Sequence, residues 1–266
     1  MHIEKLKLRK LNNTRDLGGF ATTDGRKIKR GKLIRSGKLY KLPKSTQKKL
    51  KDIGVSTIVD MRMDLECQEY PTTVMEGVNY VRVPIVCTAT TGITHEKKSM
   101  ARTMLAESKR IKHEFGDCDN YILKTYEIIL FDEASQKKLR EFLDLVIKEE
   151  GCILWHCSAG KDRTGISAML LEALLGVDEE TIIDDYVMSD TFQKNKRNLQ
   201  KLGLWLMPAF FKFKVFLFHQ MAAKPMYISG AMNAIKERYG SVKEYCKQAL
   251  GLTEEDIETL KNKYLE

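Results

Sequence analysis

The chain has 266 residues, of which 43% are hydrophobic and 30% are charged, and its formal net charge is +9. This length fits one large domain or two small ones, and the composition excludes a disordered or fibrous protein. Charges interrupt every apolar run before it reaches 18 residues, which excludes a conventional membrane-spanning helix.

The first 50 residues carry the positive charge, with 16 Lys and Arg against 3 Asp and Glu. A basic region attracts phosphate groups on nucleic acids, anionic lipids or phosphoproteins, although a solvated lysine-rich face is the alternative. No helix-turn-helix, zinc-finger or aromatic-plus-basic motif accompanies this charge. We therefore expect no nucleic-acid partner.

Strands and helices are expected to alternate along the chain. Apolar, β-branched segments predict strands at residues 32–35, 55–61, 80–86 and 152–156, with Pro84 confined to the end or edge of the third. Helical spacing predicts helices at residues 46–52, 121–130, 135–149, 163–175 and 179–189, and Gly176 ends the fourth. This alternation predicts an α/β fold, a mixed or parallel sheet with helices on both faces. No linker divides the chain, so we expect residues 1–266 to form a single domain.

Two segments do not fit the alternation and are predicted to be lids or inserts, residues 87–120 and 191–226. The second contains an aromatic stretch at residues 202–218 with two lysines and a proline within it. Core helices, a lid over the active site and a peripheral contact with an anionic membrane are the three interpretations of this stretch.

The chemistry is expected at residues 156–165, which read HCSAGKDRTG after an apolar strand and before a helix. Backbone N–H groups of such a loop and of the helix N-terminus converge on one point and bind an anion. That field favours the thiolate of Cys157, and a thiolate in an anion site is suited to attack a phosphate monoester.

Other residues of this loop have expected tasks. Arg163 can reach back to hold two phosphoryl oxygens with its planar fork, and Gly160 allows close backbone approach. Thr164 could donate its hydroxyl to the Cys157 sulfur when the thiolate leaves. His156 is expected to fix the loop through hydrogen bonds rather than to act as a base, because a thiolate has no proton to give up.

The same residues resemble a known family. HCSAGKDRTG resembles the HCxxGxxR[ST] motif of cysteine-dependent protein tyrosine phosphatases. Further similarity to the bacterial and fungal tyrosine phosphatases lies in NTRDLGGF at residues 13–20, IRSG at 34–37, IVDMR at 58–62 with Glu66, and DDY at 184–186. Members of that family include triple-specificity enzymes acting on phosphotyrosine, phosphoserine/threonine and phosphoinositides. The resemblance extends from about residue 10 to the end and implies a protein tyrosine phosphatase-like fold.

The resemblance also implies site residues. Cys157 would be the nucleophile that forms a cysteinyl-phosphate, and Arg163 would bind the phosphate. The phosphate-binding residues would be Ser158, Ala159, Gly160, Lys161, Asp162 and Arg163. Lys161 could bind a second phosphate, such as one on an inositol ring. No metal and no cofactor is implied.

The acid that protonates the leaving oxygen is the open question. Asp162 is the first candidate because it lies in the loop itself, and Asp117 or Asp119 could serve if residues 87–120 form a lid. Asp60 and Arg62 are expected to support the loop from the end of a strand. Asp16 and Arg15 are expected either to brace it or to belong to a surface turn.

The sequence therefore predicts a metal-free phosphatase that hydrolyses phosphate monoesters. Phosphotyrosine is the expected substrate, and a dual-specificity enzyme would also accept phosphoserine and phosphothreonine. A phosphoinositide phosphatase at a membrane surface and a phosphate-binding pseudophosphatase are the alternatives. The expected partner is a phosphorylated protein or a phosphoinositide, and no oligomeric state is indicated. Because the start of the chain lacks an apolar signal-peptide segment, we expect reduced thiols in the cytoplasm, with export by a signal-independent route as the alternative.

Overall fold

Strand residues of the computed structural model point alternately into two hydrophobic cores. In β5 (Cys152–His156), Leu154 joins one core, whereas Ile153 and Trp155 join the other. This alternation is the period of two that a strand buried on both faces requires. The structure describes residues 6, 8–86, 110–111, 113–190 and 222–266.

Within the described residues, five strands form one mixed sheet in the order β1-β2-β5-β3-β4. The other four strands are β1 (Arg15–Asp16), β2 (Leu33–Ser36), β3 (Val55–Asp60) and β4 (Asn79–Arg82). β1 runs antiparallel to β2, and the remaining neighbours are parallel. The sheet is thus parallel at its centre, as strands joined through helices require.

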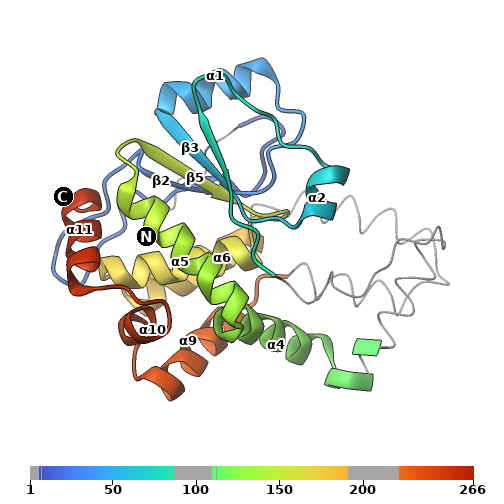
Figure 1. Ribbon diagram of the computed structural model, residues 1–266, viewed down its shortest axis with the longest axis vertical. Coiled ribbons are helices and arrows are strands. Elements are labelled where there is room, and N and C mark those ends of the chain that lie inside the picture. The colour runs from blue at the N-terminus through green and yellow to red at the C-terminus, as the bar shows by residue number, and fades with distance from the viewer. Residues whose placement is uncertain (1–5, 7, 87–109, 112, 191–221) are drawn as a thin grey trace.

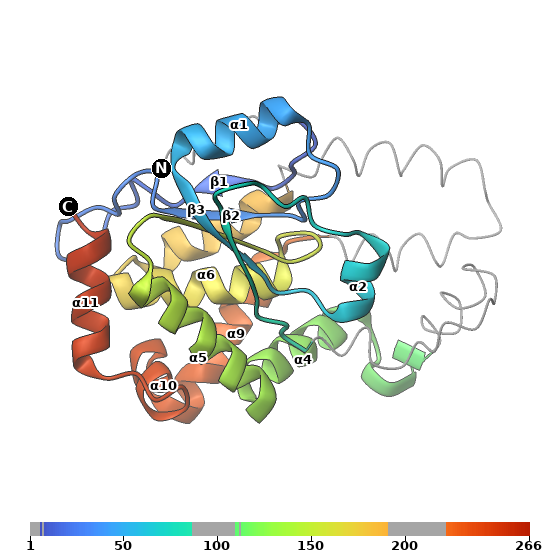
Figure 2. The ribbon, with the colours of Figure 1, turned by 45° about the horizontal axis from the view of Figure 1, so that its top comes forward.

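Helices cover both faces of this sheet (Figures 1 and 2). α1 (Lys44–Ile53) packs on one face through Leu50. The opposite face carries α5 (Glu133–Lys148) and α6 (Asp162–Leu175), beyond which lie α4 (Cys118–Phe131) and the C-terminal helices. Further helices are α2 (Asp64–Glu69), residues 179–190, α9 (Pro225–Tyr239), α10 (Val242–Gln248) and α11 (Glu254–Tyr264). The predicted α/β fold is confirmed.

The ends of three parallel strands meet where the expected chemistry lies. His156, the last residue of β5, is paired with Ser36 of β2 on one side and with Asp60 of β3 on the other. Because carboxyl ends of parallel strands share one edge of the sheet, the loops that follow them are neighbours. The loop after β5 therefore lies between two others.

The predicted elements agree with the structure to within four residues at each end. The strand expected over 80–86 ends earlier, at Arg82 in β4, because Pro84 cannot donate a ladder hydrogen bond. Gly176 ends α6 in the left-handed conformation at φ +87°. α2 and the C-terminal helices α9, α10 and α11 were not predicted from the sequence.

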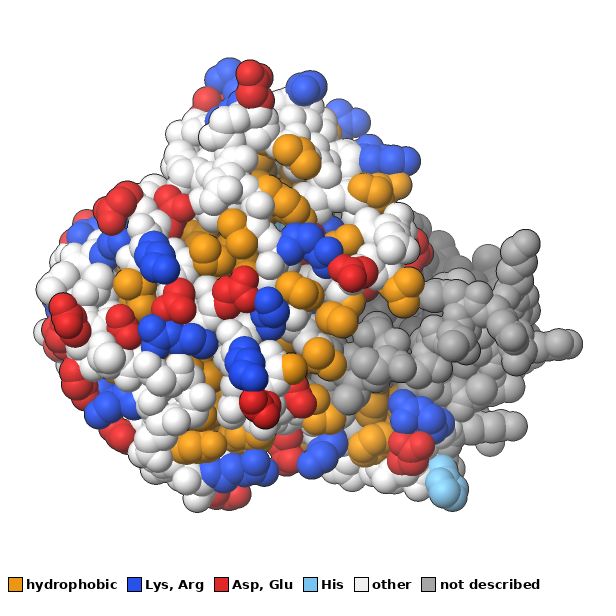
Figure 3. Space-filling view, viewed as in Figure 1, with side chains coloured by type: hydrophobic (Ala, Val, Ile, Leu, Met, Phe, Trp, Pro, Cys, Tyr) orange, Lys and Arg blue, Asp and Glu red, His pale blue; other side chains and the backbone are white. Residues whose placement is uncertain are grey.

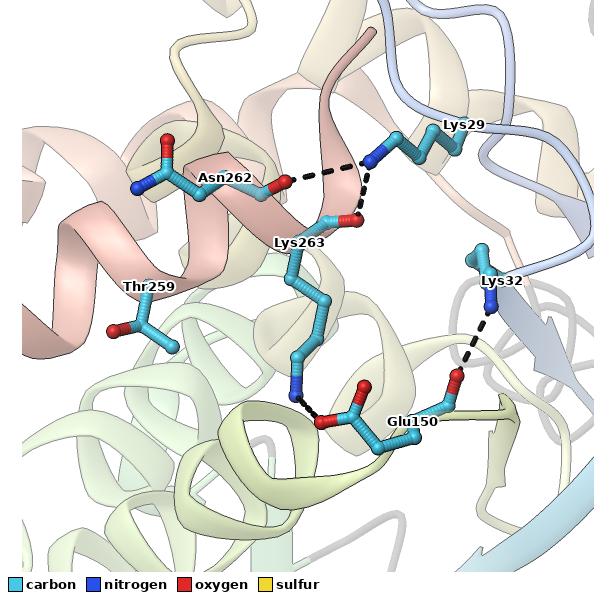
Figure 4. A pocket seen from close by; sticks show the side chains of 6 residues that line it. All are labelled: Lys29, Lys32, Glu150, Thr259, Asn262 and Lys263. Carbon is cyan, nitrogen blue, oxygen red and sulfur yellow. Dashed lines mark hydrogen bonds and ion pairs between the residues drawn. The ribbon is translucent and has the colours of Figure 1, made fainter.

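At the opposite edge of the sheet, lysines connect the C-terminal helix to the strands around a hollow of about 490 Å³ (Figure 4). Lys29 donates to the carbonyls of Asn262 and Lys263, and Lys32 donates to that of Glu150. Lys263 in turn donates to the carbonyls of residues 147 and 149 and to the Glu150 carboxylate. Three amines thus satisfy carbonyls at the ends of α5 and α11.

Most of the predicted lid segments, residues 87–120 and 191–226, lies outside the described residues, as does the aromatic stretch 202–218. Their predicted roles and the single-domain prediction stay predictions. Among the helices of the described residues, none is both long and apolar enough to cross a membrane. On the face shown in Figure 3, Lys and Arg side chains are interspersed with Asp and Glu.

Candidate active site

The candidate nucleophile lies in a short loop between β5 and α6, residues 157–161, called here the β5–α6 loop. Cys157 follows the last strand residue and is 2% exposed, and Asp162 begins α6. The N-terminal end of α6 carries the positive end of its dipole, and the first N–H groups of a helix have no partner within the helix. The fold thus brings a thiol to a site suited to an anion.

Gly160 gives the loop its shape. Its φ is +70°, and a Cβ atom built there would lie 2.5 Å from the carbonyl oxygen of Ser36, so only glycine fits without strain. In this conformation the Gly160 N–H donates to Cys157 Sγ over 3.2 Å. A backbone N–H directed at the sulfur stabilises negative charge there.

Arg163 is held in place by Glu66, which lies in the first turn of α2. Its Nη1 donates to Glu66 Oε2 over 2.6 Å and its Nη2 to Oε1 over 2.7 Å. Ser158 Oγ also donates to Glu66 Oε1. Burial raises the pKa of Glu66, but the Arg163 and Ser158 hydrogen bonds outweigh it and lower the pKa to about 2. Glu66 is therefore ionised at neutral pH and orients the guanidinium beside the loop.

Side chains from the first 36 residues hold the backbone carbonyls of the loop. Asn13 Nδ2 donates to the carbonyls of Ala159 and Gly160 over 3.1 and 2.8 Å. Arg35, from β2, donates to the Gly160 carbonyl over 3.1 Å. Arg15 donates to Asn13 Oδ1 over 2.5 Å, and so connects to the loop through Asn13.

A buried carboxylate joins the two arginines. Asp185 Oδ1 accepts from Arg15 Nε over 2.5 Å, and Asp185 Oδ2 accepts from Arg35 Nη1. All three side chains are at most 1% exposed. Burial raises the pKa of Asp185, but the charges of Arg15 and Arg35 outweigh it and lower the pKa. Buried charges require such partners, and here the partners belong to three separate segments.

Glu172, on α6, is the fourth member of this buried cluster. Burial and the neighbouring charge of Asp185 raise its pKa well above the ordinary range. Two guanidinium groups face the Asp185 carboxylate. Their positive charge beside the loop favours an anion within it.

His156 and Asp60 form a second support. The His156 ring is fully buried, with Nδ1 3.1 Å from the Cys157 carbonyl and Nε2 3.7 Å from Asp60 Oδ2. Burial lowers the pKa of His156, so the ring is neutral and can donate from Nδ1. Arg62 donates to Asp60 Oδ1 and Oδ2 over 2.9 and 2.7 Å. His156 contacts the loop through the Cys157 carbonyl, whereas Asp60 lies beside His156 and Arg62 binds Asp60. The support expected of Asp60 and Arg62 stays a prediction.

The comparisons with known proteins agree with this geometry. A model of the tyrosine phosphatase family matches residues 6–266. The chain belongs to the tyrosine phosphatase family. It is 28% identical over 260 residues to a tyrosine-protein phosphatase of Cupriavidus necator, covering 96% of this chain and 86% of that one. It is 26% identical over 257 residues to the triple specificity protein phosphatase PtpB of Mycobacterium tuberculosis, and the match covers 89% of this chain and 91% of PtpB.

Two solved structures of TpbA from P. aeruginosa, one in complex with phosphotyrosine, are each 16% identical to this phosphatase. Their TM-scores are 0.28 and 0.29, and they cover 60% and 64% of this chain and 70% and 78% of those chains. The family match shows that this chain is a cysteine-dependent phosphatase, a hydrolase of phosphate monoesters.

The residues expected to influence specificity and to supply the acid, Lys161 and Asp162, lie where the loop meets α6. Lys161 is 2% exposed, and its Nζ lies 3.1 Å from the Ala222 carbonyl and 3.2 Å from Asp162 Oδ1. Asp162 Oδ1 also accepts from the Tyr126 hydroxyl over 2.7 Å, and the Asp162 side chain is 30% exposed. Lys161 is thus the last residue of the loop and Asp162 the first of α6, and each has polar partners that fix it.

The other acid candidates have structural partners. Asp117 caps α4 by accepting from the Asn120 N–H over 2.8 Å. Asp119 accepts from Lys224 Nζ over 2.6 and 2.7 Å and from the Tyr227 hydroxyl over 2.5 Å. Neither contact involves the β5–α6 loop. Asp162 stays the first candidate for the acid.

Asp16 and Thr164, two of the expected supporting residues, make no side-chain hydrogen bond to the loop that the structure records. Asp16 accepts from the backbone N–H groups of Gly18 and Gly31 over 2.9 and 2.7 Å, and so shapes a turn. Thr164 Oγ1 is buried and makes no hydrogen bond within the described part of the chain. Its donation to Cys157 stays a prediction.

Sequence reasoning did not give Asn13, Arg35 and Asp185 a role, and it mentioned Glu66 only within a motif. All four lie in segments that resemble the family. That resemblance was the available signal, because their partners lie far away in the sequence, 147 positions for Asn13 and Gly160 and 97 for Glu66 and Arg163.

Proposed function

We propose that this phosphatase hydrolyses phosphotyrosine in proteins through a cysteinyl-phosphate intermediate. The Cys157 thiolate attacks phosphorus, the bond from phosphorus to the leaving oxygen breaks, and Asp162 gives that oxygen its proton. Water then attacks phosphorus, loses a proton to Asp162 and displaces the Cys157 sulfur, which releases phosphate. One observation carries the proposal: Cys157 Sγ accepts a backbone N–H inside a loop that leads into a helix N-terminus.

Arg163 is proposed to bind two phosphoryl oxygens, with Ser158, Ala159, Gly160, Lys161 and Asp162 contributing backbone N–H groups. Charge on these oxygens is held by donors that Glu66 and Gly160 fix beforehand, so little reorganisation is needed during the reaction. A reduced thiol at Cys157 is required, which fits the proposed cytoplasmic location.

The test measures phosphate release in the presence of a chelator, from a phosphotyrosine peptide, a phosphoserine peptide and a panel of phosphoinositides. We expect activity on the phosphotyrosine peptide that falls to background in Cys157→Ser. After an acid quench, mass spectrometry should find phosphate on Cys157 of the wild type. A folded wild-type protein that binds the peptide without releasing phosphate would instead support a pseudophosphatase.

A phosphoinositide phosphatase acting in peripheral contact with a membrane is the second proposal. Lys161 supports it, because it places a second cation beside the loop, next to Asp162. The relative PtpB is named for triple specificity. In the same assay we expect Lys161→Met to reduce turnover of phosphoinositides more than turnover of the peptide. Equal losses would remove this role from Lys161.

The assignment of the acid has its own test. General acid catalysis contributes about 10²- to 10⁴-fold, and most when the leaving oxygen is strongly basic. We expect Asp162→Asn to reduce kcat strongly for a phosphoserine or phenyl phosphate substrate and weakly for p-nitrophenyl phosphate, whose leaving group needs little help. A larger and equally selective loss in Asp117→Asn or Asp119→Asn would assign the acid to that residue instead.

A further inference from the structure

The three carbonyls on the outer side of the β5–α6 loop are all held by other segments. Ser158 O accepts from the Lys38 N–H over 3.3 Å. Ala159 O accepts from Asn13, and Gly160 O accepts from both Asn13 and Arg35. Each of these carbonyls shares a planar peptide with the N–H of the next residue.

Because each peptide is planar, a contact that holds a carbonyl on the outer side of the loop also fixes the direction of the N–H on the inner side. In a trans peptide the C=O and the N–H point in opposite directions, so a carbonyl held outward directs its N–H inward. Fixing Ala159 O directs the Gly160 N–H, which does reach Cys157 Sγ at 3.2 Å. Fixing Gly160 O directs the Lys161 N–H toward the same side. The groups that hold the carbonyls therefore aim the donors.

Asn13 is placed to do this, and its amide orientation is determined from both ends. Arg15 Nη1 can only donate, so the side of the amide that faces it must be Oδ1. Nδ2 then faces the two loop carbonyls, which can only accept. Asn13 is fully buried and has φ +54°, a conformation that asparagine tolerates better than most residues.

Two hydrogen-bond routes lead to the loop, one through Arg15 and Asn13 and one through Arg35, and Asp185 binds the arginine of each. It binds Arg15, which fixes the Asn13 amide, and Arg35, which donates directly to Gly160 O. A change at either arginine alone leaves the other route in place. Asn13 is the residue that contacts two loop carbonyls at once.

We propose that Asn13 is a positioning residue that aims the Gly160 and Lys161 N–H groups at the Cys157 sulfur and at the phosphate bound there. This inference rests on the proposed function, because it needs the loop to bind phosphate. Asn13 itself touches no reacting atom. Its loss should weaken anion binding and thiolate reactivity while the fold persists.

Two substitutions with different chemistry test the proposal. Asn13→Gly removes the donor and suits the positive φ. Asn13→Asp keeps the shape and the acceptor for Arg15 but turns an oxygen toward the two carbonyls. Thr14→Val is the matched control, because Thr14 is equally buried and bonds to Ser36 Oγ over 2.7 Å rather than to the loop.

The readouts are kcat and KM on the peptide, competitive inhibition by inorganic phosphate, and alkylation of Cys157 by iodoacetate relative to iodoacetamide. Misplacement of catalytic groups costs up to about 100-fold, and we expect kcat to fall about 10- to 100-fold in both Asn13 variants. Phosphate should inhibit about 10-fold more weakly, and the preference for the anionic reagent should decrease. Circular dichroism and thermal melts confirm that each variant is folded.

Folded Asn13 variants that match Thr14→Val in all three readouts would overturn the proposal. If both Asn13 variants fail to fold, Arg15→Lys takes their place, since a lysine can still pair with Asp185 but cannot also hold Asn13 Oδ1, which releases the Asn13 amide. It should weaken phosphate inhibition, and unchanged inhibition would overturn the proposal. An inactive wild type would contradict the proposed function, whereas an active wild type with unaffected variants contradicts only the role of Asn13.

Discussion

At the scale of single residues, Arg163 depends on Glu66 for its direction. The pair is bidentate, which is the geometry in which a guanidinium and a carboxylate bind each other most specifically. The Glu66 side chain is only 17% exposed, so solvent screens this contact less than it would a surface pair. The orientation of Arg163 is thus set before any substrate arrives.

We expect Glu66→Gln to raise KM and to reduce kcat/KM about 10- to 100-fold, because Arg163 loses its anionic partner and is no longer held beside the loop. Steady-state kinetics on a phosphotyrosine peptide measure this effect. Glu69→Gln, on the same helix but exposed, is the control and should behave as the wild type. Equal kinetics in both variants would show that the loop alone positions Arg163.

The same substitution has a pH signature in stability. Because the pKa of Glu66 is lowered to about 2 by Arg163 and Ser158, its contribution is fully present above about pH 4.5 and is lost as the pH falls toward 2. The free energy of unfolding should differ between wild type and Glu66→Gln by roughly 1–3 kcal/mol at pH 7, and the difference should shrink below pH 4.5. Urea unfolding at several pH values measures this, and a constant difference would contradict it.

Single residues also mark the limit of prediction from the sequence. Cys157 and Arg163 could be recognised because they share one short loop, where spacing alone relates them. Glu66 and Asn13 act on that loop from elements far away in the chain. Their contacts depend on how the sheet orders its strands, which no local pattern reveals.

At the scale of elements, segments with a strong apolar pattern were predictable, whereas β1 and α2, which lack one, were not. The apolar run of β5 and the helical spacing of α5 and α6 predicted those elements closely. β1 contains two residues and exists only through its pairing with β2, so it has no pattern of its own. α2 contains six residues and none of them is buried, so it lacks an apolar stripe.

The connection between β5 and α6 needs glycine at position 160 for two separate reasons. Its φ of +70° disfavours any other residue, and a Cβ would collide with the Ser36 carbonyl. We expect Gly160→Ala to lower the free energy of unfolding by about 3 kcal/mol or more and to abolish activity, since the loop must move. Denaturant unfolding and peptide turnover measure both effects.

Gly25 is the control, because it has the positive φ of Gly160 without the collision. Its φ is +89°, but nothing lies within 4 Å of a Cβ there. Gly25→Ala should therefore show only the conformational cost, roughly 1–2 kcal/mol, with full activity. Similar losses in the two variants would mean that the collision at Ser36 is relieved at no cost, and that strain alone explains Gly160.

At the scale of the whole molecule, the two edges of the sheet have different tasks. The carboxyl ends of β2, β5 and β3 hold the loop and its supports, so substitutions there are expected to change activity. At the opposite edge, lysines form hydrogen bonds that connect α11 to the segments before β2 and β5 (Figure 4). Substitutions at that edge should change stability and leave the chemistry untouched.

Lys263 tests this division. Its amine satisfies two backbone carbonyls at the end of α5, and its side chain is 16% exposed, so removing it takes a donor from two part-buried acceptors. We expect Lys263→Met to lower the free energy of unfolding by about 1–2 kcal/mol without changing kcat or KM. Lys261→Met, which loses only a 3.4 Å surface pair with Glu258, should change stability by less than about 0.5 kcal/mol. A fall in kcat for folded Lys263→Met would show that the two edges are coupled through β5, because that strand connects the hollow directly to Cys157.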